Sequence, residues 1–255
     1  MTARTLHMVA RGMKRYRQRD AEQAALIGPG GWSRLDGETL FDRQAPWRLE
    51  LGFGHGDFLS ALAAAHPAVD HLGVEHNELR VTKTAHKCRK QGLANVRVFG
   101  GDAQAFVRFR LPAASLERVY ILFSDPWPKR KHRRRRLINR ALLLDLAWAL
   151  APTGGLIIAS DCHEYALSVL SHSTTLPGLY HHRYQSGYRF DIPTRFTTVF
   201  QRHKQAAGER ICYLHLERSA QMPPRRVPMG NGLDQAGEPD LGPWPGSACQ
   251  PTVMA

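Results

Sequence analysis

From Trp47 to about Arg218, short apolar runs alternate with longer stretches in which apolar and polar residues are mixed. Short runs rich in Val, Ile, Leu and aromatic side chains predict buried strands, and the mixed stretches between them predict amphipathic helices. The expected strands are 47–51, 71–74, 95–99, 118–123, 155–159 and 211–217, and the expected helices include 58–65 and 136–150. This alternation predicts an α/β fold with a mostly parallel sheet and helices on both faces.

The pattern fades toward both ends of the chain. Residues 1–45 are basic and then glycine-rich, with a strong breaker at Gly28-Pro29-Gly30-Gly31, which predicts an arm or cap. Residues 219–255 are dominated by Pro, Gly and polar side chains, and a segment with so little to bury is expected to be disordered. We therefore expect an arm at 1–45, one domain at 46–218 and a tail at 219–255.

The composition agrees with a single domain and also indicates which class of partner the protein binds. The 255 residues are 43% hydrophobic, and their mean hydropathy is −0.38, which suits a single sizeable core with polar ends. Thirty-five Lys and Arg against 22 Asp and Glu give a formal charge of +13 and a pI near 10.1. Such an excess indicates a protein that meets a polyanion, as RNA-binding proteins do.

The cysteines and the N-terminal residues bear on the compartment and on metal binding. The chain has four cysteines and no Cys-x-x-Cys pair, so neither a zinc site nor a disulfide framework is indicated and a reducing cytoplasmic setting is the default. No run of about eighteen apolar residues is present to predict a membrane span. Residues 1–20 are rich in Arg and lack the apolar stretch of a secretory signal; an RNA-facing arm is preferred over an organelle transit peptide.

Acidic residues recur where the expected strands end. They are Glu50, Glu75, Asp102, Asp125 and Asp161. Ligands of open α/β sheets bind at the carboxyl ends of the strands. These five carboxylates therefore mark the candidate site.

The loop after the first strand reads Gly52-Phe53-Gly54-His55-Gly56-Asp57. A dinucleotide fingerprint is Gly-x-Gly-x-x-Gly, whose helix N-terminus faces a pyrophosphate. Here the third glycine comes one residue early, and Asp57 and Glu50 would repel phosphate. A cationic ligand without phosphates fits better, and S-adenosylmethionine is the obvious candidate.

The most informative segment is Ser124-Asp125-Pro126-Trp127-Pro128, followed directly by the basic run 129–136. The run holds seven Lys and Arg residues, which favours contact with phosphates over a merely solvated surface. Trp127 could stack on a base or pack under the loop, and both interpretations stay open. Asp57 and Asp161 could equally be helix caps or ligand contacts. A carboxylate, an indole and a dense positive field in one loop indicate an active site that faces nucleic acid.

Several segments together carry a resemblance to a known family. They are 49–54, 73–75, 101–103, 123–129 and 160–161. In this order they look like the motifs of tRNA (guanine-N7)-methyltransferases, across about Trp47 to Arg218. The resemblance implies a Rossmann-like class I methyltransferase fold with a seven-stranded sheet. It also implies S-adenosyl-L-methionine as cofactor and tRNA as partner, with methylation of guanine N7 at position 46 of the variable loop.

Individual residues carry over from the matching motifs. The resemblance implies that Glu50, Gly52, Gly54, Glu75, Asp102 and Asp125 contact the cofactor, that Asp125 also lies at the reaction centre, and that Lys129 and Asp161 bind the RNA. The family's late Thr-Lys-Phe-Glu segment matches Thr198-Val199-Phe200-Gln201, which implies substrate contacts for Thr198 and Gln201. Two of these four residues differ from the family pattern, and the change removes both charges.

The chemistry needs neither a metal nor a covalent nucleophile, because guanine N7 already offers a lone pair and only has to be aligned. Our hypothesis is that Asp125 accepts hydrogen bonds from the guanine N1 and amino hydrogens and offsets the positive charge that develops on the ring.

The altered segment 198–201 supports one alternative, an RNA-binding paralogue with lost or changed activity. A methyltransferase of exocyclic amines is less favoured, because Trp127 stands where its second proline would be. Monomer and homodimer both remain open.

Overall fold

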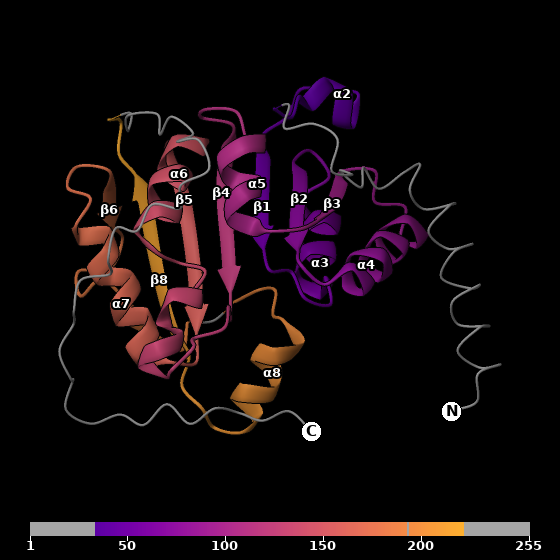
Figure 1. The fold of residues 1–255 in the computed structure, drawn as a ribbon. Helices are drawn as coiled ribbons and strands as arrows, with labels where there is room; N and C mark the ends of the chain where they lie inside the picture. Colours follow the sequence, from indigo (N-terminus) through magenta and orange to yellow (C-terminus); the bar gives the residue numbers. More distant parts are fainter. Residues whose placement is uncertain (1–33, 193, 222–255) are drawn as a thin grey trace.

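A single eight-stranded sheet organises the chain in the computed structural model, which describes residues 34–192 and 194–221. Its order is β3-β2-β1-β4-β5-β8-β6, with β7 paired to β8 off this path (Figure 1). The strands are β1 (Trp47–Leu51), β2 (Asp70–Glu75), β3 (Val96–Gly100), β4 (Leu116–Leu122), β5 (Leu150–Ser160), β6 (Tyr180–His182), β7 (Arg189–Phe190) and β8 (Cys212–Arg218). β1 to β5 are parallel, and β8 runs antiparallel to β5. The predicted α/β class with a mostly parallel sheet is confirmed.

The strand count differs slightly from the seven that the family resemblance implied. Seven strands lie on the main path, and the additional strand β7 has only two residues. The six strands expected from apolar runs correspond to β1 to β5 and β8. No apolar run predicts β6 or β7, because three and two residues are too few to form one.

The helices are α2 (Gly37–Phe41), α3 (Asp57–Ala65), α4 (Glu78–Lys90), α5 (Ala103–Arg110), α6 (Arg140–Ala149), α7 (His163–Thr174) and α8 (Val199–Ala206), with a 3-10 helix η1 at Arg130–Arg135. Alternate strand residues point to opposite faces of the sheet. Leu49 and Leu51 pack with α5, α6 and α7 in one cluster. Val96 and Val98 pack with α3 and α4 in another. The helices therefore cover both faces.

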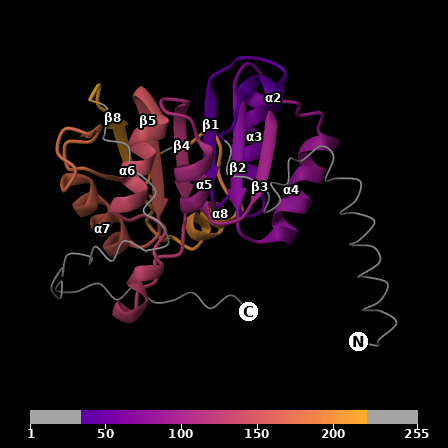
Figure 2. The ribbon, with the colours of Figure 1, turned by 45° about the horizontal axis from the view of Figure 1, so that its top comes forward.

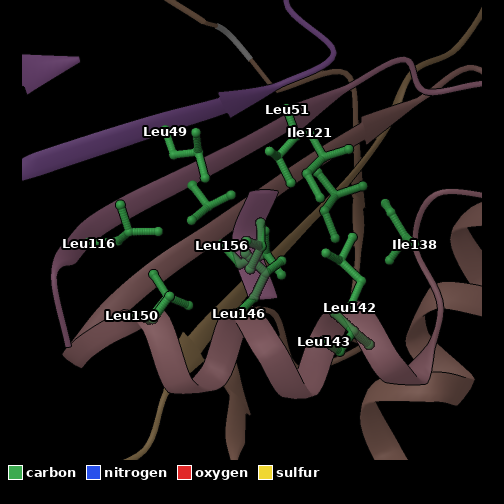
Figure 3. Packing of buried hydrophobic residues seen from close by; sticks show 14 of the residues in the cluster. Leu49, Leu51, Leu116, Ile121, Ile138, Leu142, Leu143, Leu146, Leu150 and Leu156 are labelled. Atoms are coloured by element: carbon green, nitrogen blue, oxygen red, sulfur yellow. The ribbon is translucent and has the colours of Figure 1, made fainter. Parts of the chain in front are cut away.

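Helix α6 fastens the centre of the sheet. Figure 3 shows Leu142, Leu143 and Leu146 of α6 directed toward leucines of the strands, and all of these side chains are fully buried. Truncating such a side chain to Ala costs about 2–5 kcal/mol. The packing holds β1, β4 and β5 in register, which fixes the positions from which their C-terminal loops start.

The expected helix at 136–150 begins four residues later than predicted. Asn139 caps α6 by accepting a 2.9 Å hydrogen bond from the Leu142 amide, and 130–135 form the separate 3-10 helix η1. A run of basic residues favours no helix boundary by composition alone. The capping asparagine was the signal that the prediction overlooked.

Both ends of the chain fall largely outside the described residues. The described part of the predicted arm includes α2, and its Leu35 and Phe41 are buried in the main core cluster. The predicted disorder of the tail lies outside the described part of the chain, apart from residues 219–221. Cys88, Cys162 and Cys212 are buried free thiols. No helix in the described part of the chain is long and apolar enough to cross a membrane.

Candidate functional site

The carboxyl ends of five parallel strands form one edge of the sheet. Glu50 lies on β1 just before this edge, Glu75 ends β2, and Asp102, Asp125 and Asp161 follow β3, β4 and β5. β8 is antiparallel and starts at this same edge. The preceding helix α8 consequently lies beyond the arrowheads of β1 and β4, as Figures 1 and 2 show. The fold thus brings the predicted acidic residues to one edge.

Glycines of the loop after β1 have two different roles. Gly52 and Gly54 have positive φ angles of 75° and 56°, and beyond each glycine and its two chain neighbours no described atom lies within 4 Å of where a side chain would start. At Gly56 a Cβ would come within 2.3 Å of Thr84 Cγ2, so this third glycine lets α3 begin close against α4. The first two leave open backbone that a ligand can approach.

Glu50 is the most unusual acid of the edge. Its side chain is 2% exposed, and its Oε2 has no hydrogen-bond partner among the described residues. Burial raises the pKa of Glu50 to about 8, with contributions from the charges of Asp57 and Glu75. A hydrogen bond from the Leu59 backbone lowers this pKa only in part, and a buried carboxylate with one oxygen left without a partner is costly to ionise. A cation at this position would therefore be strongly favoured.

Asp57, the first residue of α3, is balanced by an ion pair. Lys87 Nζ of α4 lies 2.7 Å from Asp57 Oδ1, and it also donates to the His55 carbonyl oxygen at 2.7 Å. Asp57 therefore joins α3 to α4. Whether it also contacts a ligand stays a prediction.

Glu75 and Asp102 brace the loops around the glycines. Glu75 accepts from the Gly54 amide at 2.9 Å and from the Asn77 amide at 3.0 Å. Asp102 caps α5 through a 2.7 Å bond from the Ala105 amide. A carboxylate has about four acceptor positions, so both side chains can still accept hydrogen bonds from a ligand. Their expected cofactor contacts stay predictions.

The loop after β4 presents Asp125 to solvent. Asp125 is exposed, and two residues with left-handed backbone flank it, Phe123 (φ 58°) and Trp127 (φ 40°). Trp127 is half-buried. The Arg135 guanidinium carbon lies 5.0 Å from the Trp127 ring centroid, and the His132 ring packs edge-on at 5.7 Å. The indole is thus in contact with basic side chains at the edge of the site.

The basic run divides into exposed and engaged residues. Lys129, Arg130, Lys131, Arg134 and Arg135 are exposed. Arg133 Nη2 lies 2.6 Å from Glu164 Oε1, and Arg136 is only 5% exposed. The expectation that the whole run faces phosphates is therefore wrong for Arg136, because its guanidinium group is inside the protein.

The segment 198–201 forms the start of α8. Thr198 caps the helix by accepting from the Gln201 amide at 2.9 Å. Gln201 is 3% exposed, and its Nε2 donates to Thr194 Oγ1 at 3.0 Å and to the Tyr213 hydroxyl at 2.9 Å. These bonds fasten α8 to β8. The substrate contacts expected of Thr198 and Gln201 stay predictions, and the Gln201 side chain is turned inward.

Lys204 belongs to the site although no sequence pattern predicts it. Its Nζ lies 3.0 Å from Asp161 Oδ2 and 2.8 Å from Glu209 Oε2. Burial lowers the pKa of Lys204, but the bonds to Glu209 and Asp161 outweigh this, so the pKa is raised above 10.5. Nothing in the local pattern distinguishes this lysine from an exposed one.

Within the described residues, no group of three or more His, Cys, Asp or Glu side chains is placed to hold a metal ion.

Solved structures share the fold. The chain superposes on the 16S rRNA methyltransferase KamB with a TM-score of 0.56 at 15% identity, covering 76% of this chain and 98% of that one. It also superposes on the [4+2]-cyclase SpnF with a TM-score of 0.50 at 13% identity, covering 81% of each chain. Because the second protein is a cyclase, the fold does not by itself decide the activity.

Sequence relatives define the family. Residues 44–212 match a family model described as "Putative methyltransferase". A tRNA (guanine-N(7)-)-methyltransferase of Hydrogenovibrio crunogenus is 35% identical over 72% of this chain and 77% of that protein. Proteins of the same name from Geobacter metallireducens and Leifsonia xyli subsp. xyli are 30% and 36% identical, each over 77% of this chain and 90% of the relative. By this similarity, and by the motifs now seen at one edge of the sheet, the chain belongs to the tRNA (guanine-N7)-methyltransferase family.

Proposed function

We propose that this chain transfers the methyl group of S-adenosyl-L-methionine to N7 of a guanine in tRNA, at position 46 of the variable loop. The observation that carries the proposal is the shared sheet edge. The buried Glu50 carboxylate, whose Oε2 has no hydrogen-bond partner among the described residues, and an open glycine loop lie at the same edge as the exposed Asp125 and the basic run. Family membership supplies the tRNA and the guanine atom.

The residues present fit this cofactor. Its amino and sulfonium groups are cationic, and Glu50 Oε2 is a buried acceptor that has no partner in the described part of the chain. Glu75 stands at the end of β2, where a carboxylate can accept from ribose hydroxyls. Gly52, Gly54 and Asp102 would complete the pocket. When bound, the cofactor supplies an activated methyl group.

The chain's own residues have to align the base. Guanine N7 carries a lone pair, so no general base is required, and positioning supplies most of the acceleration. Asp125 accepts hydrogen bonds from the guanine N1 and amino hydrogens. Its negative charge offsets the positive charge that the ring gains.

The RNA is held outside the reaction centre. The exposed Lys129 and its exposed basic neighbours contact phosphates, and Trp127 offers a face for stacking on a splayed base. Asp161 helps to hold the substrate, and its ion pair with Lys204 sets the orientation of the Asp161 carboxylate. We further propose that residues 46–218 carry the activity in the cytoplasm, with the tail 219–255 outside the methyltransferase domain. Of the arm 1–45, Leu35 and Phe41 belong to the core of that domain.

Methyl transfer from labelled S-adenosyl-L-methionine to an unmodified tRNA transcript tests the proposal. Nuclease digestion should release labelled 7-methylguanosine, and a transcript with adenine at position 46 should remain unlabelled. Label in another nucleoside would overturn the proposed chemistry. RNA binding without any transfer would favour the paralogue with lost activity, which is less well supported because relatives at 30–36% identity are named as the enzyme.

A further inference from the structure

The loop that carries Asp125 has a conformation that needs to be held. Phe123 and Trp127 both have left-handed backbone, at φ 58° and 40°. Left-handed backbone costs free energy in bulky residues, and it persists only where neighbouring structure enforces it. Hydrogen bonds from residues outside the loop must therefore hold it in this conformation.

Arg136 grips the loop after Asp125. Its Nε donates to the Pro126 carbonyl oxygen at 2.8 Å. Its Nη1 donates to Ser168 Oγ at 3.2 Å, and its Nη2 lies 3.5 Å from Glu164 Oε1. One planar guanidinium group thus bonds the loop to two residues of α7, in a fork that lysine cannot reproduce.

Tyr165 grips the loop before Asp125. Its hydroxyl lies 3.2 Å from Ser124 Oγ and accepts from the Ile138 amide at 3.1 Å. The Tyr165 ring is fully buried, and the Arg136 guanidinium carbon lies 5.1 Å from its centroid. Burial raises the pKa of Tyr165, so the hydroxyl keeps its proton and can donate to Ser124.

We propose that Arg136 and Tyr165 are positioning residues that hold Asp125 in its working orientation from both sides. The inference rests on the proposed function of Asp125. It separates Arg136 from the rest of the basic run, because Arg136 is 5% exposed and already bonded to the loop. The neighbouring exposed residues meet RNA, whereas Arg136 acts on the geometry of the reaction centre.

The test is the substitution Arg136→Lys, which keeps the charge and removes the fork. A displaced carboxylate should lower kcat by up to about 100-fold. The affinity for S-adenosyl-L-methionine, the affinity for tRNA and its salt dependence should stay within about twofold. Tyr165→Phe, which removes only one hydroxyl, should lower kcat by roughly tenfold, and it serves as the second variant if Arg136→Lys does not fold. Arg140→Lys, at an exposed arginine of α6, is the matched control and should keep the wild-type kcat.

A readout that does not depend on activity completes the experiment. Trypsin should cleave within 129–136 faster in Arg136→Lys than in Arg140→Lys, because the loop is released. An unchanged kcat together with an unchanged cleavage rate would overturn the inference. So would a loss confined to tRNA affinity with a smaller salt slope, which would make Arg136 a phosphate contact. If the wild-type protein methylates no tRNA, the proposed function fails by itself, and the cleavage rates still decide whether Arg136 holds the loop.

Discussion

Lys204 Nζ lies 3.0 Å from Asp161 Oδ2, so an ammonium group on α8 is bonded to the end of β5. Its side chain is 8% exposed and that of Asp161 is 20% exposed. The segment 198–201 lacks the lysine and the carboxylate of the family pattern. Lys204, three residues further along the same helix, places a cation at the catalytic edge.

Replacing Lys204 by Gln should therefore destabilise the fold and disturb substrate binding together. Removing one partner of a fully buried ion pair costs about 3–5 kcal/mol, and here the partial exposure of Asp161 reduces the expected loss to about 1–3 kcal/mol. Urea denaturation measures it. Methylation assays should show a raised KM for tRNA, because Asp161 loses its orientation.

Two further variants make this prediction specific. Asp161→Asn in the Lys204→Gln background should recover part of the lost stability, since Asp161 no longer leaves a partly buried charge unpaired. Lys90→Gln, at an exposed lysine that ends α4, should leave both measurements near wild type. Equal losses for the two lysine variants would show that Lys204 contributes no more than an ordinary surface charge.

Cofactor binding should release a proton from Glu50 near pH 7. With a pKa of about 8, the free protein holds Glu50 mostly protonated at this pH, and a bound cation favours the ionised form. Calorimetric titration in two buffers of different ionisation enthalpy should report the release of about one proton. Glu50→Gln should bind more weakly and release none. Equal binding enthalpies in both buffers for the wild-type protein would contradict the assignment.

Glu50 should also give the free protein a characteristic pH dependence. Its pKa is raised on folding from 4.5 to about 8, so its contribution to stability is fully present below pH 4.5 and is lost as the pH rises through 8. Relative to wild type, Glu50→Gln should gain stability across this window, on the order of a few kcal/mol at its upper end. Denaturation at pH 5 and pH 8.5 without cofactor measures the difference. A constant difference between the two proteins would mean that Glu50 titrates normally.

The strands and the acidic edge could be predicted because both depend on local patterns. Apolar runs indicated β1 to β5 and β8, and parallel strands necessarily bring their carboxyl ends together. The glycine loop after β1 was also recognisable. The glycine pattern did not reveal that the three glycines have different roles, because Gly56 allows α3 to pack against Thr84.

Contacts between distant segments could not be predicted. Arg136 and Tyr165 are 29 positions apart in the numbering, and their meeting depends on how α7 packs beside the loop after β4. Arg136 stands in a run that looks uniformly exposed, yet it is buried. Lys204 was missed for the same reason, because its partner Asp161 belongs to another element. Charge density in a sequence does not tell which of the charges tertiary packing will use.

The exposed members of the basic run should determine the salt dependence of RNA binding. Each phosphate contact releases counterions, so losing one should reduce the slope of log affinity against log salt by about one unit. Lys131→Ala should do so, and Lys131→Ala with Arg134→Ala should do so further, both without changing kcat at saturating tRNA. Lys90→Ala, at the far end of α4, is the control. Filter binding between about 50 and 200 mM salt measures the slopes, and identical slopes for all variants would make the run a solvated surface.

Asp125→Asn should slow methyl transfer far more than it weakens binding. The amide keeps the size of the side chain, but it carries no charge to offset the positive ring, and its NH2 group cannot accept from the guanine N1 and amino hydrogens. Removing one such group from a reaction centre typically costs about 100- to 1000-fold in kcat. Single-turnover transfer with saturating tRNA isolates this step from product release. Asp42→Asn is a suitable control, because Asp42 is exposed, follows α2 and has a φ of 55° that asparagine also tolerates. An unchanged single-turnover rate in Asp125→Asn would show that Asp125 does not act in the reaction. Arg136 and Tyr165 would then have no catalytic group to position.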